Sequence, residues 1–345
     1  MKLLLLGGTM FLGRHLAEAA LRAGHEVTLF HRGQTGADLF PEAEHILGDR
    51  VGPLDALAGR SWDAVVDTSA YFPDMVRASA GLLGKSIGQY IFVSTISVYS
   101  DVSQPGLTES APRLELTAAQ LEEAYELRRQ GVARGSALGH LYGGLKTACE
   151  VETERAMGDR GLIIRPGLIV GPHDYSDRFT YWVRRMDRGG EVLAPGSPER
   201  RIQFIDARDL AEWTLRMAES SAFGVYQATG PETPIGMGEF LGACSKASGN
   251  PARLHWVSED FLAAEKVGPW MEMPLWVPDT PDSRGFMDMD CSKAIQTGLT
   301  FRPVLDIVRD TLEWDRGRPR NEPLKAGLTA ERESELLSRH ASSSP

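Results

Sequence analysis

The stretch that decides the fold is Lys2-Leu3-Leu4-Leu5-Leu6-Gly7-Gly8-Thr9-Met10-Phe11-Leu12-Gly13. Its four leucines predict a buried strand, because they meet a glycine turn and fall far short of the ~20 apolar residues that a membrane helix needs. Gly7 permits the tight turn, Gly8 leaves room for an approaching pyrophosphate, and Gly13 lets the next helix pack closely on the sheet. The first N–H groups of that helix would face the phosphates. A plain glycine turn is the alternative, and Met10 departs from the usual glycine pattern, but the order of strand, turn and helix favours a dinucleotide site.

The first 170 residues alternate short apolar runs with amphipathic stretches, which is typical of a parallel sheet covered by helices on both faces. We expect a doubly wound α/β fold of the Rossmann type, whose ligands bind beyond the carboxyl ends of the strands. The expected strands are 2–6, 26–30, 45–47, 64–67, 90–94 and 162–165, and the expected helices are 11–22, 74–83 and 142–157. A further helix over 207–219 leads to a strand over 224–228 that could return to this sheet.

The composition changes after Pro172, because six of the seven tryptophans and most of the prolines follow it. We expect a smaller, interleaved α/β substrate lobe at about 172–202 and 231–338. The dinucleotide domain would then comprise 1–171 and about 203–230. The serine-rich residues 339–345 are expected to form a disordered tail.

Charge and cysteine usage exclude several classes of function. Lys and Arg number 37 against 47 Asp and Glu, which gives a net charge of −10 without a lysine-rich tract, so nucleic acid is a poor candidate partner. The three cysteines lie far apart and the histidines are scattered, so neither a disulfide framework nor a metal site is indicated. We expect a cytoplasmic protein with a small-molecule substrate and no membrane partner, and a homodimer stays open.

Tyr142 and Lys146 lie at positions i and i+4 of an expected helix, so they share one face. A tyrosine with a pKa of about 10 is a poor acid–base catalyst at neutral pH, and a nearby cation would lower that pKa. Thr95 and Ser97 follow the strand 90–94, where hydroxyls could polarise a substrate carbonyl or alcohol. Their simplest alternative role is to end the strand.

The end of the second strand bears on cofactor choice. A carboxylate there would bind the ribose of NAD, but this chain has His31 and Arg32. We therefore predict NADP(H) in preference to NAD(H), with NAD(H) as the alternative if Arg32 is only a solvated loop cation. Asp49, after the third strand, is placed to hold the adenine edge, next to Arg50.

These motifs occur in the order of the extended short-chain dehydrogenase/reductase superfamily, and the chain resembles the NAD-dependent epimerase/dehydratase family within it. The resemblance covers roughly residues 1–315. It is carried by the glycine turn, Ser94-Thr95-x-x-Val98-Tyr99, Tyr142-x-x-x-Lys146, Arg165-Pro166-Gly167-Leu168-Ile169-Val170-Gly171-Pro172 and Phe204-Ile205-Asp206-Ala207-Arg208-Asp209-Leu210-Ala211. It implies that Thr95 polarises the substrate, that Tyr142 is the acid/base, and that Lys146 is its electrostatic partner and a ribose ligand. Hydride would pass between a substrate carbon and the nicotinamide.

The expected site residues form two sets. The cofactor set is Gly7, Gly8, Thr9, Met10, Phe11, Leu12, Gly13, His31, Arg32, Asp49, Arg50, Ser69, Ala70, Tyr142, Lys146 and Pro166. The substrate set is Thr95, Ser97, Leu168 and Arg178, with Arg178 as an anchor for an anion or, alternatively, a solvated loop residue. Arg32 and Arg165 could also serve anionic groups locally.

Two departures from the family pattern weaken the expectation of a nucleotide-sugar substrate. Leu168 replaces the asparagine that many nucleotide-sugar enzymes have there, and the arginine usual just before Phe204 is displaced to Arg200-Arg201. The leading hypothesis is an NAD(P)-dependent oxidoreductase or epimerase that acts on a small hydroxyl or keto compound, with sugar derivatives among the candidates. The sequence does not separate epimerase, reductase and dehydratase.

An alternative of a different class is a non-catalytic cofactor-sensing or RNA-binding protein on the same fold. The pattern Gly-Gly-Thr-x-Phe-x-Gly also resembles that of plastid RNA-binding proteins that have lost the Tyr/Lys pair. Retention of Tyr142 and Lys146, together with the negative net charge, favours an enzyme.

Overall fold

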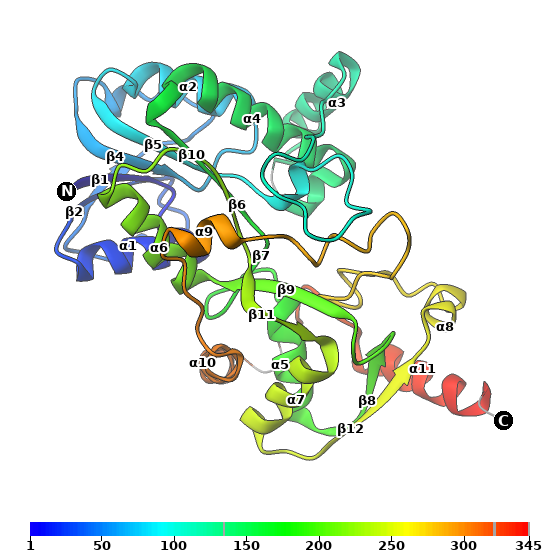
Figure 1. The fold of residues 1–345 in the computed structure, drawn as a ribbon. Helices are drawn as coiled ribbons and strands as arrows, with labels where there is room; N and C mark the ends of the chain where they lie inside the picture. The colour runs from blue at the N-terminus through cyan, green and yellow to red at the C-terminus, as the bar shows by residue number, and fades with distance from the viewer. Residues whose placement is uncertain (134, 320–321, 344–345) are drawn as a thin grey trace.

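The computed structural model describes residues 1–133, 135–319 and 322–343. A seven-stranded parallel sheet with the order β10-β6-β5-β4-β1-β2-β3 dominates one half of the molecule (Figure 1). Its strands are β1 (Lys2–Leu6), β2 (Glu26–His31), β3 (Glu44–Leu47), β4 (Trp62–Asp67), β5 (Ile87–Val93), β6 (Gly161–Pro166) and β10 (Gly224–Ala228). The expected doubly wound fold is confirmed, including the return of residues 224–228 to the sheet beside β6. The strand order reverses between β1 and β4, which is where such sheets bind ligands.

The leucines of β1 show why this strand lies at the centre of the sheet. Successive side chains of a strand point to opposite faces, so Leu3 and Leu5 join one hydrophobic cluster while Leu4 and Leu6 join another. All four are almost completely buried, with exposed fractions of 0–1%. Because both faces must be covered, the strand carries no alternating polar residues.

Two pairs of helices cover these faces (Figure 1). On one face α1 (Phe11–Arg22) packs against α6 (Ala207–Glu219), and on the other α2 (Pro73–Leu83) packs against α4 (Tyr142–Met157). The short 3-10 helix η2 (Ile96–Val98) follows β5, and α3 (Ala118–Arg129) precedes α4 in the chain. Tyr142 and Lys146 lie in the first two turns of α4, a helix that packs against this face of the sheet.

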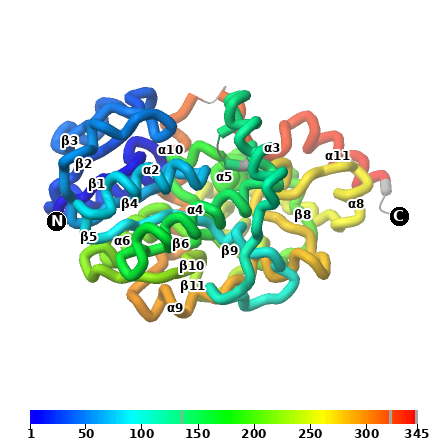
Figure 2. The backbone as a smooth tube through the Cα atoms, turned by 90° about the horizontal axis from the view of Figure 1, so that it is seen from above, coloured from blue at the N-terminus to red at the C-terminus, as the bar shows by residue number. Residues whose placement is uncertain are grey.

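The second half of the molecule contains two small sheets and most of the later helices (Figures 1 and 2). One sheet joins β7 (Leu168–Val170), β9 (Arg201–Asp206) and β11 (Gly230–Gly236), and the other joins β8 (Gly190–Pro195) and β12 (Ala252–Val257). The helices of this half are α5 (Arg178–Arg188), α7 (Met237–Ser248), α8 (Glu259–Ala264), α10 (Val304–Arg316) and α11 (Ala330–Ser343), whereas α9 (Ser292–Gln296) packs beside β10 of the large sheet.

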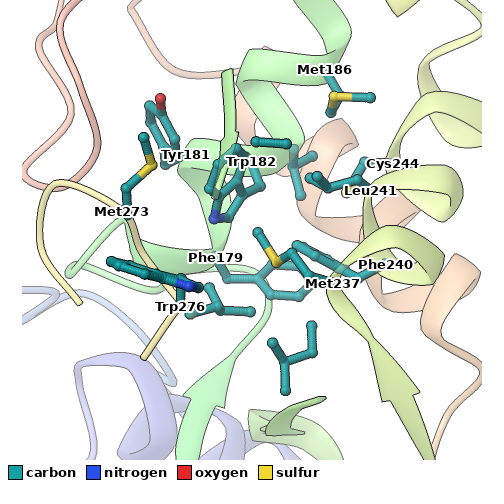
Figure 3. Close-up of a cluster of buried hydrophobic side chains, with 14 of the residues drawn as sticks. Phe179, Tyr181, Trp182, Met186, Met237, Phe240, Leu241, Cys244, Met273 and Trp276 are labelled. Carbon is teal, nitrogen blue, oxygen red and sulfur yellow. The ribbon is translucent and has the colours of Figure 1, made fainter. Parts of the chain in front are cut away.

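Aromatic and sulfur-containing side chains fill the core of this second half (Figure 3). Phe179 and Phe240 bring α5 and α7 together, with ring centroids 5.0 Å apart. The Trp182 indole donates a hydrogen bond to the carbonyl oxygen of Pro274 at 2.7 Å, so a proline-rich loop is fixed to α5. The abundance of tryptophan and proline after residue 172 thus reflects a core built from loops as well as helices.

The expected disordered tail is wrong over most of its length. Helix α11 continues to Ser343, and Arg339 pairs with Glu335 one turn earlier and with Glu265 at the end of α8. These charge pairs hold a segment whose serines alone suggested fraying, while residues 344–345 lie outside the described residues. In residues 1–133, 135–319 and 322–343, we find no helix with the length and apolar character needed to cross a bilayer.

Candidate active site

The glycine turn between β1 and α1 has the geometry that its glycines demand. Gly7 and Gly8 adopt φ angles of 110° and 122°, which residues with side chains rarely adopt. A Cβ on Gly13 would lie 2.6 Å from the backbone nitrogen of Gly8, so α1 can approach the turn only because position 13 has no side chain. The α1 N-cap, Met10, makes no side-chain capping bond, and the first turn holds no acidic residue. The N–H groups of this turn are therefore suited to an anionic ligand.

The loop after β4 lies beside this turn. Thr68 and Ser69 donate hydrogen bonds from their hydroxyls to the carbonyl oxygen of Leu6, at 3.2 and 2.9 Å. A Cβ on Gly7 would come within 2.5 Å of the Thr68 hydroxyl oxygen. The structure thus brings Ser69 and its neighbour Ala70 together with the glycine turn, as expected for residues that share a cofactor.

Lys146 extends from α4 to the same loop. Its Nζ donates to the carbonyl oxygens of Ala70 (2.9 Å) and Val93 (2.8 Å). The Phe92 and Tyr71 rings lie 4.1 and 5.4 Å from this nitrogen. Lys146 is 3% exposed, and burial lowers the pKa of its ammonium. A cation held in this way can serve a ligand that reaches the carboxyl ends of β4 and β5.

Tyr142 lies one helical turn before Lys146, at the start of α4. Burial raises the pKa of its phenol to about 12, while a hydrogen bond with Thr95 and the charge of Arg178 act in the opposite direction. The ammonium of Lys146 is instead directed to two backbone carbonyls. In this arrangement Thr95 and Arg178 are the groups that favour the phenolate, a role that the sequence suggested for Lys146.

Thr95 and Ser97 lie together at the end of β5. Thr95 is the N-cap of η2, and its hydroxyl oxygen accepts a hydrogen bond from the Ser97 backbone at 3.1 Å. It also donates to the Ser97 hydroxyl at 3.2 Å. The hydroxyls of Thr95 and Ser97 therefore lie near the phenol of Tyr142. Together the three groups form the polar set expected around a substrate oxygen.

Arg178 begins α5 and faces the same region. Its charge interacts with Tyr142, and its guanidinium lies over the Trp270 ring at 5.0 Å. Its Nε donates to the Ser176 hydroxyl at 3.2 Å, and within the described part of the chain it forms no ion pair. Such a cation remains available to an anionic group of a ligand.

Two other residues that the sequence assigned to ligands lie elsewhere. Arg165 is 2% exposed and forms a two-pronged ion pair with Glu150 through bonds of 2.9 and 2.8 Å. It is therefore part of a buried network and does not serve an anion. Leu168 is 5% exposed and belongs to the hydrophobic core of the second half.

The end of β2 leaves Arg32 exposed and fixes its neighbour His31. The Gly33 backbone donates to His31 Nδ1 at 3.1 Å, so His31 Nε2 carries the proton and donates to His45 at 2.8 Å. Burial, followed by the charge of His45, lowers the pKa of His31. His31 is thus a neutral support for the loop that carries Arg32.

The remaining cofactor candidates have structural partners. Asp49 is exposed and accepts a hydrogen bond from the Val51 backbone at 3.0 Å, which closes a local turn. Arg50 is buried, and its guanidinium donates to Asp67. Pro166 ends β6, where it is paired with Ala228.

Three aromatic residues lie near the site, and two of them, Tyr71 and Trp270, were not expected from the sequence. Tyr71 lies with its ring 6.3 Å from that of Tyr142, and Tyr175 lies 6.1 Å from Phe11 in the glycine turn. Tyr71 directly follows the expected Ala70, so its position after β4 could have identified it. Trp270, whose ring lies under the Arg178 guanidinium, comes from a distant loop, and no nearby motif in the sequence indicates that it belongs to the site.

Two comparisons with known sequences found matches. Residues 140–228 match the model of the NAD dependent epimerase/dehydratase family. The chain is 25% identical to the chloroplast stem-loop binding protein of 41 kDa b of Arabidopsis thaliana, over 92% of this chain and 80% of that protein.

Solved structures share the fold. The UDP-N-acetylglucosamine 4-epimerase of Bacillus cereus superposes with a TM-score of 0.67 at 17% identity, over 94% of this chain and 99% of that one. The Bordetella bronchiseptica enzyme WbmH, solved in complex with NAD+, gives a TM-score of 0.65 at 19% identity, over 92% and 98%. The fold class expected from the sequence is confirmed, and the family model that matches residues 140–228 is that of the family expected from the motifs.

Proposed function

We propose that this chain is an extended short-chain dehydrogenase/reductase of the NAD-dependent epimerase/dehydratase family, whose model matches residues 140–228, and that it is an enzyme that moves hydride between a nicotinamide cofactor and a hydroxyl or keto carbon of a small substrate. The observation that carries the proposal is the convergence of Thr95, Tyr142 and Lys146 at the carboxyl ends of β4 and β5. Thr95 comes from the end of β5, whereas Tyr142 and Lys146 both come from α4, so two separate segments of the chain supply them.

The residues present fit a nicotinamide dinucleotide. The uncapped start of α1, the glycine turn and the loop Thr68–Ala70 would hold the phosphates, and Lys146 would hold a ribose. When bound, the nicotinamide supplies or accepts the hydride. We infer a preference for NADP(H) because the exposed Arg32 follows β2 in place of a carboxylate; NAD(H) is the alternative, since WbmH was solved with NAD+.

Tyr142 would move the proton that accompanies the hydride. Because burial raises the pKa of its phenol, the residue is protonated at neutral pH and suited to donate a proton to a substrate carbonyl oxygen. Thr95 would hold that oxygen and donate a second hydrogen bond to it. In the reverse direction the Arg178 charge and the Thr95 hydroxyl stabilise the phenolate that must accept the proton.

The substrate would carry an anionic group. Arg178 faces Tyr142 without an ion pair among the described residues, so a phosphate or carboxylate could bind it beside the reacting carbon. The solved neighbours include an enzyme named for a UDP-sugar substrate. We infer a sugar-derived substrate with support from that likeness, although Leu168 lies in the core and offers no polar contact to a nucleotide.

Replacement of Tyr142 by Phe tests the proposal. Turnover should be abolished while the dinucleotide still binds, as measured by the fluorescence of NADPH or NADH on titration with protein. Unchanged turnover would remove Tyr142 from the mechanism. Purified protein that retains cofactor tightly would indicate an epimerase, whereas steady consumption of NADPH with a ketone would indicate a reductase.

The similarity to a stem-loop binding protein raises the second class of function, but the site does not favour it. Tyr142, Thr95 and Lys146 are assembled around one region, and the net charge is −10. A polyanion would be repelled overall. The same Tyr142→Phe variant distinguishes the two classes, because RNA binding would not depend on the phenolic hydroxyl.

A further inference from the structure

A buried ion pair lies beneath the loop that holds Lys146. Arg50, which follows β3, donates from Nη2 to the carboxylate of Asp67, the last residue of β4. The same nitrogen lies 3.4 Å from the carbonyl oxygen of Met75 in the first turn of α2. The side chains of Arg50 and Asp67 are 9% and 0% exposed. Neither charge can therefore be balanced by bulk water.

The Asp67 carboxylate fixes the residues that follow it. Its Oδ1 accepts hydrogen bonds from the backbone nitrogens of Ser69 and Ala70, both at 3.1 Å. Its Oδ2 accepts a bond from the Tyr90 hydroxyl at 2.6 Å, in addition to the bond from Arg50. A carboxylate that accepts this many hydrogen bonds is held rigidly.

Ala70 connects the ion pair to the proposed active site. Its nitrogen donates to Asp67, and its carbonyl oxygen accepts the hydrogen bond from Lys146 at 2.9 Å. The next residue, Tyr71, covers the ammonium with its ring at 5.4 Å. Ala70 alone thus links the buried carboxylate of Asp67 to the ammonium of Lys146.

We propose that Arg50 and Asp67 are positioning residues, which fix the loop Thr68–Tyr71 and thereby hold the ammonium of Lys146 in place. The importance of this arrangement for proton transfer rests on the proposed function. The ion pair lies apart from Thr95 and Tyr142, the residues proposed to touch the substrate.

The unsatisfied nitrogens of Arg50 support a role beyond stability. Within the described residues, its buried Nε and Nη1 have no hydrogen-bond partner. Buried donors without partners cost free energy, so an arginine selected for stability alone would be expected to satisfy them. The contact that the Arg50 side chain does make is the ion pair with Asp67, so we assign its role to that charge.

The groups around Lys146 define the electrostatic consequence. Burial lowers the pKa of the ammonium, while Cys149, Asp67 and Glu150 act in the opposite direction. Burial raises the pKa of Cys149 to about 12, so this thiol is uncharged at neutral pH. Glu150 is already paired with Arg165 and Arg113. Loss of the Asp67 charge should therefore lower the pKa of Lys146, and loss of the Arg50 charge should raise it.

Nuclear magnetic resonance of ¹³C-labelled lysine side chains tests this directly, because the chain contains only seven lysines. The Lys146 signal is assigned by its disappearance in Lys146→Arg and titrated with pH in the wild type, Asp67→Asn and Arg50→Met. We expect shifts of about one pH unit downward in Asp67→Asn and upward in Arg50→Met. Arg60→Gln, which removes one surface arginine charge, is the matched control and should leave the signal unchanged.

The outcome separates the inference from the proposed function, because this titration needs no substrate or cofactor. Identical titration of Lys146 in the wild type and the folded variants, or shifts in the same direction, would overturn the positioning role. If Arg50→Met does not fold, the test is the pKa of Lys146 in Asp67→Asn compared with that in Arg60→Gln. In turnover assays the alkaline limit of activity should move to lower pH in Asp67→Asn, since Lys146 then loses its proton earlier. A wild type without any turnover would instead contradict the proposed function.

Discussion

The ammonium of Lys146 donates a hydrogen bond of 2.9 Å to the carbonyl oxygen of Ala70, which lies 76 residues earlier in the chain. A second bond, to Val93, ties the same ammonium to the end of the neighbouring strand. Lys146→Met should therefore leave two buried carbonyl oxygens without their donor, at a cost of roughly 1–3 kcal/mol in the free energy of unfolding. Turnover should fall by about 100-fold or more, as measured by steady-state kinetics. Lys146→Arg keeps the charge and serves as the control; a Lys146→Met enzyme with full activity would contradict the assignment.

Arg32 should govern the choice between the two nicotinamide cofactors. Arg32→Glu places a carboxylate where the ribose of NAD can bind and where a 2′-phosphate is repelled. We expect the ratio of kcat/KM for NADP(H) over NAD(H) to fall by at least about tenfold, or ~1.4 kcal/mol. Because Arg32 is exposed, stability should change by less than about 0.5 kcal/mol. A wild type that prefers NAD(H), or a ratio that does not move, would disprove the role of Arg32.

Gly13 should be intolerant of a side chain for steric reasons. The Cβ of Gly13→Ala would lie 2.6 Å from the Gly8 nitrogen, so α1 must move away from the turn. We expect a loss of roughly 1–3 kcal/mol in the free energy of unfolding and weaker dinucleotide binding. Gly81→Ala is the matched control on α2, since no atom lies within 4 Å of its added Cβ, and helix propensity predicts a gain of up to about 1 kcal/mol. Equal denaturation midpoints for the two variants would refute the packing argument.

His173 should weaken the fold in acid. Burial, helped by the charges of Arg14 and His15, lowers the pKa of His173 from 6.5 to about 4. The unfolded chain binds this proton first, so the stabilisation is complete above pH 6.5 and is lost as the pH falls toward 4. His173→Asn, which suits the φ angle of 69° at this position, should reduce that loss. Denaturant titrations at several pH values measure the effect; His140→Asn, at a residue with 67% side-chain exposure, is the control and should keep the wild-type slope.

Much of the fold could be predicted because its signals are local. The leucine run, the glycine turn and the i, i+4 spacing of Tyr142 and Lys146 each depend on a few consecutive residues, and β1, α1 and α4 begin and end where expected. The helical end of the chain was missed because its stability comes from Glu265, far away in sequence. Arg165 was assigned to a ligand because its partner Glu150 lies on another element.

The sequence by itself determined the elements and the chemistry they carry: a buried strand, a glycine turn, and a phenol and an ammonium on one helix. Only the tertiary structure decided which group faces which. It directed Lys146 to Ala70, set Arg178 against Trp270 and toward Tyr142, and placed Arg50 beneath the loop after β4. The physical reason is that periodicity and backbone preference act over a few residues, whereas these contacts depend on strand order and on the packing of separate loops at the carboxyl edge of one sheet.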